Sequence, residues 1–221
     1  MIAVAIDGPA GAGKSTIARK AASELGYIYV DTGAIYRAVG LACTQKKIDP
    51  SDSEKVVEML PETEISIVFF NGEQHVLLDD KDVSSEIRTE KASMTASKVS
   101  AIPEVRKFLL DLQRNFAKND NVVMDGRDIG TVVLPNAQVK IFLTASPETR
   151  AKRRVLQLKE KGETADYNTV LADIIQRDYD DSHREIAPLK AADSAVMVDT
   201  SELTLEQSIA KIISIIKEHI E

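Results

Sequence analysis

The segment IDGPAGAGKST, residues 6–16, constrains this chain more than any other stretch of its sequence. The pattern G-x-x-x-x-G-K-[ST] is filled here by Gly8, Gly13, Lys14 and Ser15. The pattern is meaningful when a strand precedes it and a helix follows it. Residues 2–6 (IAVAI) are a short apolar run typical of a buried parallel strand, and residues 14–25 have a helical pattern that Gly26 ends. The segment therefore predicts a phosphate-binding loop between a strand and a helix.

This loop predicts a ligand as well as a shape. Glycines let the backbone wrap around phosphate oxygens, so that N–H groups and the helix N-terminus point at the anion. Lys14 adds a mobile positive charge for the β- and γ-phosphates, and the hydroxyl of Ser15 suits Mg²⁺. A nucleoside triphosphate with magnesium is the expected ligand.

The other apolar runs extend the same layout. Strand-like runs lie at residues 27–30, 121–125, 139–143 and 195–199. Helical patterns separate them, which predicts an α/β fold with three layers and a central parallel sheet. Residues 65–78 differ, because Asn71-Gly72 lies between two strand-like runs and predicts an antiparallel hairpin. We expect one P-loop domain over residues 1–221, with residues 65–88 as a small antiparallel β insertion.

Composition excludes several other classes of protein. A net charge of −7 argues against a general nucleic-acid surface, which usually has a basic excess. The single cysteine, Cys43, cannot form an internal disulfide, and the three histidines lack metal-ligand spacing. No signal peptide and no apolar run long enough for a membrane span is recognisable. We therefore expect a cytoplasmic monomer that binds neither nucleic acid nor membrane.

Two polar segments follow predicted strands. DTGAIYR covers residues 31–37 and DGRDIGT covers residues 125–131. In an open α/β sheet, segments that leave the carboxyl ends of strands line the ligand crevice. Arg37 and Arg127 can each recognise phosphate, while Asp128 can only accept hydrogen bonds. A single arginine is more often solvated or ion-paired, but two at strand exits beside a phosphate loop favour phosphate recognition.

A third cluster of arginines lies on two predicted helices. The first begins with Ser146 as N-cap and Pro147 at the first helical position, and it ends at Gly162. Arg150, Arg153 and Arg154 share one face of it by their spacing, and Arg177, Asp181 and Arg184 share one face of the next helix. Alone, each helix would read as an exposed, salt-bridged surface. Beside a triphosphate site, residues 150–167 predict a short helical lid that neutralises charge and excludes water.

These motifs together resemble one known family. The segments DGPAGAGKST, DTGAIYR, DGRDIGT, RAKRR and QRDYDDSHREIAPL follow the order found in bacterial-type cytidylate kinase. This family of nucleoside monophosphate kinases moves the γ-phosphoryl group of ATP to CMP or dCMP in pyrimidine nucleotide metabolism. The resemblance covers nearly the whole chain, the insertion included.

The resemblance implies roles for individual residues. ATP would contact Gly8, Pro9, Ala10, Gly11, Ala12, Gly13, Lys14, Ser15, Thr16 and Arg153, with Ser15 at Mg²⁺. CMP would contact Thr32, Arg37, Ser97, Arg106, Arg127, Asp128, Arg177, Asp181 and Arg184. Catalysis would depend on Lys14, Arg127, Arg154 and Arg184. Within the CMP set, Arg37 and Arg127 hold the phosphate, Asp128 with Arg106 and Ser97 reads the cytosine edge, and Arg177 with Asp181 contacts the sugar. Some members carry Ser at the position of Thr32 and Gly-Thr at the position of Ser15-Thr16.

Chemistry separates this interpretation from two alternatives. A kinase with a hydroxyl acceptor needs a base, whereas a phosphate monoester is already a dianion at neutral pH. Arginines outnumber candidate bases around the predicted crevice, which favours a phosphate acceptor. A nucleotide-gated switch would carry a guanine-specifying N-K-x-D segment, which the sequence lacks. A fixed carboxylate such as Asp128 also accepts from the amine of cytosine and opposes the carbonyl of uracil.

Overall fold

The computed structural model describes residues 1–160 and 162–220, which form two compact units. Unit 1 contains Met1 and residues 28–122, and unit 2 contains residues 2–27 and 123–221. The elements of unit 1 are β2 (Ile28–Asp31), α2 (Thr32–Gln45), α3 (Ser53–Met59), η1 (Leu60–Glu62), β3 (Ile65–Phe70), β4 (Glu73–Leu78), β5 (Lys81–Asp82), η2 (Glu86–Arg88), α4 (Glu90–Val99) and α5 (Pro103–Asn119). The elements of unit 2 are β1 (Ala3–Asp7), α1 (Lys14–Leu25), β6 (Val122–Gly126, whose first residue belongs to unit 1), η3 (Ile129–Val133), β7 (Val139–Thr144), α6 (Pro147–Glu160), α7 (Tyr167–His183), β8 (Val196–Asp199) and α8 (Leu205–Ile220).

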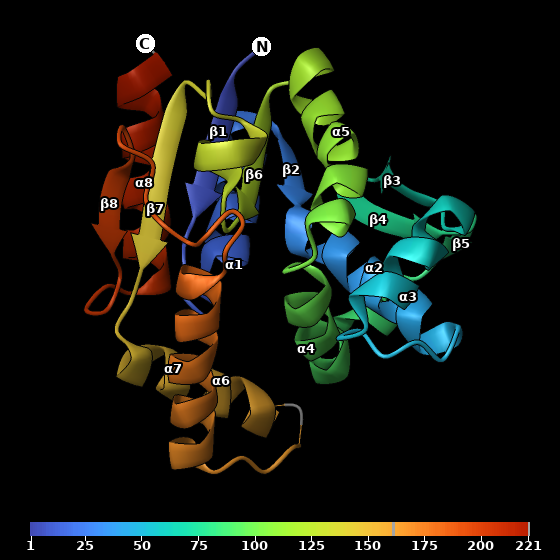
Figure 1. Ribbon diagram of the computed structural model, residues 1–221. Coiled ribbons are helices and arrows are strands. Elements are labelled where there is room, and N and C mark those ends of the chain that lie inside the picture. The colour runs from blue at the N-terminus through green and yellow to red at the C-terminus, as the bar shows by residue number, and fades with distance from the viewer. Residues whose placement is uncertain (161, 221) are drawn as a thin grey trace. The chain divides into compact units, whose positions relative to one another are not determined.

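The larger sheet has the strand order β2-β6-β1-β7-β8, with the glycine-rich loop leaving its middle strand (Figure 1). β7 runs parallel to both β1 and β8, with Val4 opposite Val139 and Ile141 opposite Val196. All five residues of β1 are buried. This double burial explains why residues 2–6 are apolar without alternation. The predicted central parallel sheet is confirmed.

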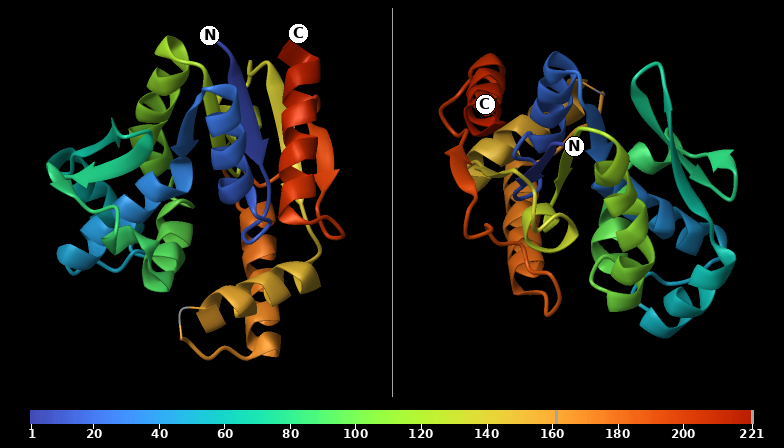
Figure 2. Two further views of the ribbon diagram at one scale, coloured as in Figure 1. Left: turned by 180° about the vertical axis from the view of Figure 1, so that it is seen from behind. Right: turned by 90° about the horizontal axis from the view of Figure 1, so that it is seen from above.

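Two helices of unit 2 cover one face of this sheet. α1 and α8 lie side by side there (Figure 2). α8 begins with a capping box, in which the N–H of Thr204 donates to Oε1 of Gln207 at 2.9 Å and the N–H of Gln207 donates to Oγ1 of Thr204 at 3.2 Å. Ile212 and Ile216 from its apolar stripe are fully buried. This helix therefore packs its apolar side against the rest of unit 2.

The predicted strand at residues 27–30 lies one residue later. Gly26 ends α1 in the left-handed region, with φ 69°. The N–H of Tyr27 then bonds to the carbonyl of Ala22 at 2.8 Å. This bond belongs to the end of the helix, and Tyr27 is therefore not available to β2, which begins at Ile28.

Unit 1 contains the antiparallel insertion. β3 pairs with β4 from Ile65 opposite Leu78 to Phe70 opposite Glu73, and the turn residues Asn71 and Gly72 have φ values of 52° and 78°. Two positive φ angles in a two-residue turn match the twist of the strands. The predicted hairpin is confirmed, and β5 adds a short third strand that the sequence does not predict. One face of the hairpin packs on α2, and η2, which follows the hairpin, packs on α2 and α4. Val76, Val83 and Ile87 are buried in this core.

The predicted lid, residues 150–167, covers most of α6, and its last residue, Tyr167, is the first residue of α7. α6 follows β7 at its carboxyl end, and α7 packs against α6 (Figure 1). Ser146 caps the start of α6, since its Oγ accepts from the N–H of Thr149 at 3.2 Å. Pro147 is the first residue of the helix, as predicted. Within the predicted lid 150–167, Lys161 lies outside the described residues.

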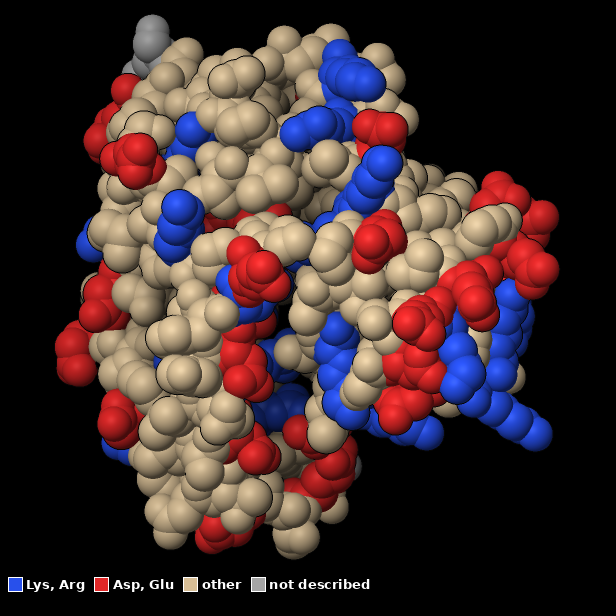
Figure 3. Space-filling model, viewed as in Figure 1, with Lys and Arg blue, Asp and Glu red and all other residues tan. Residues whose placement is uncertain are grey.

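The surface carries both signs of charge. Acidic and basic side chains are interspersed on the face drawn in Figure 3. None of the helices within residues 1–160 and 162–220 is long and apolar enough to cross a membrane.

Candidate active site

The loop between β1 and α1 is shaped by the close approach of its first glycine to β7. A Cβ atom on Gly8 would lie 1.9 Å from the carbonyl oxygen of Leu143, and the φ angle of Gly8 is +150°. No side chain can be placed there without moving the strand. Gly13 is the N-cap of α1, and no side chain caps the N–H groups that follow it. Uncapped N–H groups at a helix start favour an anion, so the loop has the form expected for binding phosphate.

Lys14 is the first residue of α1 and is only 5% exposed. Its Nζ donates to the carbonyl of Pro9 at 2.8 Å, across the loop. Burial, joined by the positive charge of Arg127, lowers the pKa of Lys14 to about 7. The lysine is therefore close to losing its charge until an anion arrives.

Ser15 and Asp125 bring two oxygen donors together beside the loop. The hydroxyl of Ser15 donates to Oδ2 of Asp125 at 2.8 Å. Asp125 is buried near the carboxyl end of β6, next to β1 in the sheet. Mg²⁺ prefers such hard oxygen ligands and usually keeps waters and substrate phosphates as its other ligands. The pair fits that ion, although no group of three or more His, Cys, Asp or Glu side chains gathers within the described residues.

Asp7, the last residue of β1, fixes the segment that follows β6. Its two carboxylate oxygens accept from the N–H groups of Ile129 at 2.7 Å and Gly130 at 2.8 Å. Asp7 is only 3% exposed, and this burial raises its pKa to about 6 against the effect of the two hydrogen bonds. Because η3 begins at Ile129, the carboxylate of Asp7 holds the first turn of η3, directly after Asp128.

Arg127 and Asp181 form a buried ion pair. Nε of Arg127 donates to Oδ2 of Asp181 at 2.8 Å, joining the exit of β6 to α7. Burial opposes the charge of both groups. The attraction of Asp181 and other carboxylates outweighs it and raises the pKa of Arg127, while the charges of Arg127, Arg177 and Arg184 hold the pKa of Asp181 below its usual value. Both side chains therefore stay ionised.

Arg184 and Asp128 are the next neighbours in this cluster. Nη2 of Arg184 lies 3.8 Å from Oδ1 of Asp128, and both side chains are less than 10% exposed. The prediction that Arg177, Asp181 and Arg184 share one helix face needs a correction. α7 ends at His183, and Arg184 has an extended backbone with ψ 143°. The structure still brings Arg127, Asp128, Arg177, Asp181 and Arg184 into one charged cluster of unit 2.

The arginines of α6 differ in their surroundings. Arg150 is 2% exposed; its guanidinium donates to the carbonyls of Ala145 at 2.9 Å and Ala10 at 3.0 Å, and it pairs with both oxygens of Asp178. Arg153 donates to the carbonyl of Thr200 at 2.7 Å. Arg150 therefore ties α6 to α7 and to the loop, and the lid role of the three arginines stays a prediction. Arg154 lies half-buried on the same helix.

In unit 1, Arg37 folds back over the first turn of α2. Its Nη2 donates to Oδ2 of Asp31, the N-cap of the helix, at 2.8 Å. Gly33 leaves the room for this, since a Cβ there would lie 3.1 Å from Nη1 of Arg37 and 3.1 Å from Oδ1 of Asp31. Thr32, the first residue of α2, is 3% exposed.

Arg106 and Ser97 are linked through Ser100, at the corner between α4 and α5. Nη1 of Arg106 donates to the carbonyl of Ser100 at 3.2 Å, and the hydroxyl of Ser100 donates to the carbonyl of Ser97 at 2.9 Å. The guanidinium of Arg106 also lies 5.6 Å from the centre of the Tyr36 ring, on α2. Unit 1 thus places Arg106 against the helix that carries Arg37, while Asp128, the third predicted base-reading residue, belongs to unit 2.

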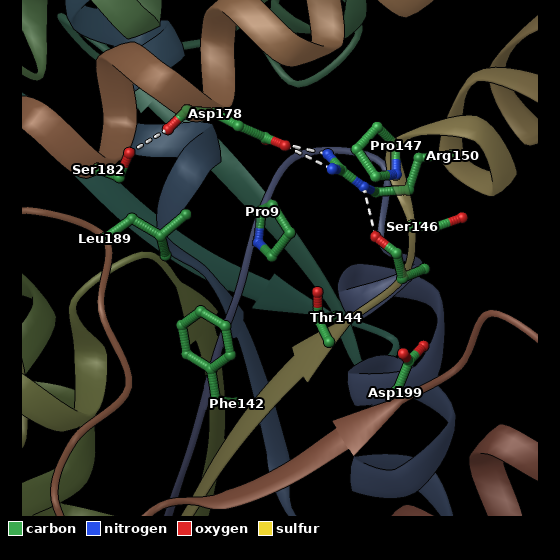
Figure 4. Close-up of a pocket in the computed structure, with 11 residues that line it drawn as sticks. Pro9, Phe142, Thr144, Ser146, Pro147, Arg150, Asp178, Ser182, Leu189 and Asp199 are labelled. Atoms are coloured by element: carbon green, nitrogen blue, oxygen red, sulfur yellow. Dashed lines mark hydrogen bonds and ion pairs between the residues drawn. The ribbon is translucent and has the colours of Figure 1, made fainter.

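A cavity of about 410 Å³ lies in unit 2 at the carboxyl ends of β7 and β8 (Figure 4). Pro9 borders it from the loop, and Arg150 and Asp178 border it from α6 and α7. Phe142 and Thr144 line the floor from β7. The cavity is therefore adjacent to the predicted triphosphate loop.

Sequence reasoning did not select four carboxylates that organise these groups. They are Asp7, Asp31, Asp125 and Asp178. A signal for two of them exists, because Asp7 and Asp125 each stand before a glycine at the end of a buried apolar run. Nothing local distinguishes Asp178 from Asp180 and Asp181 beside it.

Comparison with known proteins gives a match over nearly the whole chain. The family model for cytidylate kinase matches residues 4–218. The chain is 52% identical to a cytidylate kinase of Caldicellulosiruptor bescii over 214 residues, which cover 97% of this chain and 95% of that protein. It is 49% identical to a cytidylate kinase of Lactobacillus johnsonii, covering 99% of this chain and 95% of that one.

A solved structure shows a likeness of fold. The crystal structure of an uncharacterized protein from Eubacterium ventriosum superposes with a TM-score of 0.54 at 13% identity, covering 98% of this chain and 99% of that one.

Proposed function

Because the chain belongs to the cytidylate kinase family, we propose that it transfers the γ-phosphoryl group of ATP to CMP or dCMP, giving ADP and CDP or dCDP. The observation that carries this is the 52% identity to a cytidylate kinase over 97% of the chain. The uncapped glycine loop with Lys14, and the buried cluster of arginines and carboxylates, supply the chemistry that this reaction needs.

The donor nucleotide belongs at the glycine loop. Residues 8–16 bind the phosphates of ATP through main-chain N–H groups, and Lys14 regains its charge when it leaves the carbonyl of Pro9 for a phosphate oxygen. Arg153, which bonds to Thr200 at the exit of β8, contributes from α6. The cavity beside Pro9 leaves open volume next to this loop.

Ser15 and Asp125 are the residues that would hold Mg²⁺. When bound, Mg²⁺ would neutralise charge on the β- and γ-phosphates. The hydroxyl of Ser15 would give up its hydrogen bond to Asp125, so that both oxygens face the cation or its waters.

The acceptor is a phosphate dianion, so that the protein clamps it and removes no proton. Arg37 and Arg127 hold this phosphate, and Thr32 lies beside Arg37 on α2. One acceptor oxygen bonds to the γ-phosphorus while the bond from that phosphorus to the bridging oxygen breaks, and the electron pair leaves on ADP. Arg154 and Arg184 offset the negative charge of the loose transition state.

Specificity for cytosine rests on Asp128. Its carboxylate is 4% exposed and can accept from the exocyclic amine of cytosine. A uracil carbonyl at that place would leave two acceptors facing each other without a proton between them. Arg106 and Ser97 complete the reading of the base, and Arg177 with Asp181 contacts the sugar.

A hydroxyl-acceptor kinase and a nucleotide-gated switch are not favoured. Close relatives over the full chain are cytidylate kinases. The carboxylates of the cluster are also engaged with arginines or main-chain N–H groups rather than placed as proton acceptors. A phosphate acceptor fits both facts.

A substrate panel tests this function. ADP release is measured with CMP, dCMP, UMP, AMP, shikimate and gluconate, for the wild type and for Asp128→Asn. We expect CMP and dCMP to be the preferred acceptors, and Asp128→Asn to lower the CMP-over-UMP preference about tenfold or more while the KM for ATP stays unchanged. Asp193→Asn, at an exposed position of the same unit, is the matched control.

Two results would contradict the proposal. Turnover of shikimate or gluconate above that of CMP would place the chain among hydroxyl-acceptor kinases. An unchanged base preference in Asp128→Asn, combined with a raised KM for ATP, would move Asp128 to the donor site.

A further inference from the structure

The inserted hairpin of unit 1 reaches the residue that caps α2. Gln74, on β4, uses its side-chain amide on the main chain of Asp31: Oε1 accepts from the N–H of Asp31 at 2.8 Å, and Nε2 donates to the carbonyl of Asp31 at 3.2 Å. Asp31 ends β2, the outermost strand in the sheet order. An outermost strand leaves one row of N–H and carbonyl groups unpaired. The amide of Gln74 carries the same donor and acceptor as a peptide group, and it pairs with Asp31 as an added strand would.

The side chain of Asp31 also accepts two hydrogen bonds. Oδ1 accepts from the N–H of Ala34 at 3.0 Å, which caps α2, and Oδ2 accepts from Arg37 at 2.8 Å. Hydrogen bonds therefore hold the main-chain N–H, the carbonyl and both carboxylate oxygens of Asp31. Gln74 makes two of these four bonds.

Arg37 is the group that this arrangement orients. Its guanidinium bonds to Asp31 through Nη2 and lies against Gly33, where any side chain would crowd it. Its Nε–H is buried and has no hydrogen-bond partner among the residues that the structure describes. A buried unsatisfied donor costs about 1–3 kcal/mol, which a phosphate oxygen placed against the guanidinium would recover.

We propose that Gln74 is a positioning residue for the kinase reaction: it fixes Asp31, and through Asp31 it holds the guanidinium of Arg37 in place for the acceptor phosphate. This inference rests on the proposed role of Arg37. It gives the inserted hairpin a task in acceptor binding, because an arginine already oriented loses less freedom when the phosphate binds. The donor loop lies in unit 2 and the three residues of this arrangement lie in unit 1, so that we expect the KM for ATP to stay unchanged.

The test replaces the amide without changing the length of the side chain. In Gln74→Met both hydrogen bonds are lost and the packing volume is retained. We expect the KM for CMP to rise about fivefold, the equivalent of one net hydrogen bond, while the KM for ATP stays within a factor of two. Glu73→Met, at the exposed neighbouring position of β4, is the matched control and should change neither constant.

Cytidine provides the readout that a merely structural role would not move. Gln74→Met should weaken binding of CMP and leave binding of cytidine, which lacks the phosphate, unchanged. Gln74→Glu is the second variant: it keeps an acceptor for the N–H of Asp31 but turns a carboxylate oxygen toward its carbonyl, and it should also raise the KM for CMP. Equal weakening of CMP and cytidine would overturn the proposal, because the effect would then not pass through the phosphate.

Arg37→Met separates failure of this inference from failure of the proposed function. If Arg37→Met raises the KM for CMP and Gln74→Met does not, the role of Gln74 is overturned while the function stands. If Arg37→Met leaves the KM for CMP unchanged, Arg37 does not bind the acceptor phosphate and the relay is overturned with it. In the double variant, the effect of Gln74→Met should disappear in the Arg37→Met background, and additive effects would contradict a shared path.

Discussion

Lys14 and Arg127 are two cations held inside unit 2 before any nucleotide arrives. They repel each other, and this repulsion adds to burial in lowering the pKa of Lys14 to about 7. Arg127 keeps its charge because Asp181 and other carboxylates surround it. The lysine is therefore the member of the pair that can give up a proton. A phosphate bound beside Lys14 would raise its pKa again and keep it charged.

Binding of ATP should consequently draw a proton onto Lys14. With a pKa near 7 in the free protein and an ordinary value beside phosphate, uptake should approach about one proton per ATP at pH 8 and fall to about a tenth at pH 6. Titration calorimetry in two buffers of different ionisation enthalpy measures the number of protons taken up when ATP binds. Lys14→Met is the control, and the difference between wild type and variant isolates the lysine from protons carried by ATP itself. A difference that does not change between pH 6 and pH 8 would contradict the lowered pKa.

Helices α6 and α7 are joined by Arg150, whose guanidinium also reaches the carbonyl of Ala10 in the glycine loop. A guanidinium that is 2% exposed needs its full set of acceptors, and among the described residues Asp178 is the charged acceptor of Arg150, beside two main-chain carbonyls. The ion pair between Arg150 and Asp178 therefore ties α7, which carries Asp181, to the glycine loop. Tertiary bonds of this kind, rather than helix propensity, decide how such elements are held.

Removing Asp178 should loosen both helices. Asp178→Ala leaves Arg150 buried with its charge uncompensated, and we expect a loss of about 2 kcal/mol of unfolding free energy, less than for a fully buried pair because a quarter of the Asp178 side chain is exposed. Hydrogen exchange in α6 and α7 should accelerate. Asp180→Ala is the matched control, since Asp180 is exposed and its carboxylate accepts from Gln176 on its own helix. This variant should stay within about 0.5 kcal/mol of the wild type. Equal exchange in both variants would show that the ion pair does not hold α7.

Stability of the whole molecule should depend on pH through Asp7. Its pKa is about 6 in the folded protein, against an ordinary value of 3.8. Because the folded-state value is the higher one, this group contributes stability that is complete below pH 4 and is lost as the pH rises through 6. The difference between the two values corresponds to about 3 kcal/mol.

Urea unfolding of the wild type and of Asp7→Asn between pH 4 and pH 7 measures this contribution. Relative to Asp7→Asn, which cannot titrate, the wild type should gain about 2.4 kcal/mol of unfolding free energy when the pH falls from 7 to 4, and the rest of the difference lies below pH 4. Taking the difference between the two proteins removes the carboxylates that titrate in both. A constant difference across this range would mean that Asp7 is ionised throughout, stabilised by the N–H groups of Ile129 and Gly130.

The sequence by itself determined the features whose causes are local. The apolar run before Gly8 predicts β1. Gly26 ends α1 because glycine readily adopts the left-handed conformation found there. Asn71-Gly72 sets the hairpin register through two positive φ angles. The family was also within reach, since several motifs occur in one order along the chain. In each case the residues that cause the feature lie within a few positions of it.

Only the tertiary structure decided which charged side chains hold one another. Asp7 accepts from N–H groups that lie more than 120 residues later in the chain, and Gln74 bonds to Asp31 across 43 residues. Arg150 pairs with Asp178 rather than with the neighbouring aspartates of α7. Helical spacing places Arg150 on a face with Arg153 and Arg154, but it says nothing about whether that face meets solvent or a buried carboxylate. The physical reason is that a buried charge is stable only when folding places hydrogen-bond or ion-pair partners beside it. The positions of these partners leave no periodic pattern in the sequence.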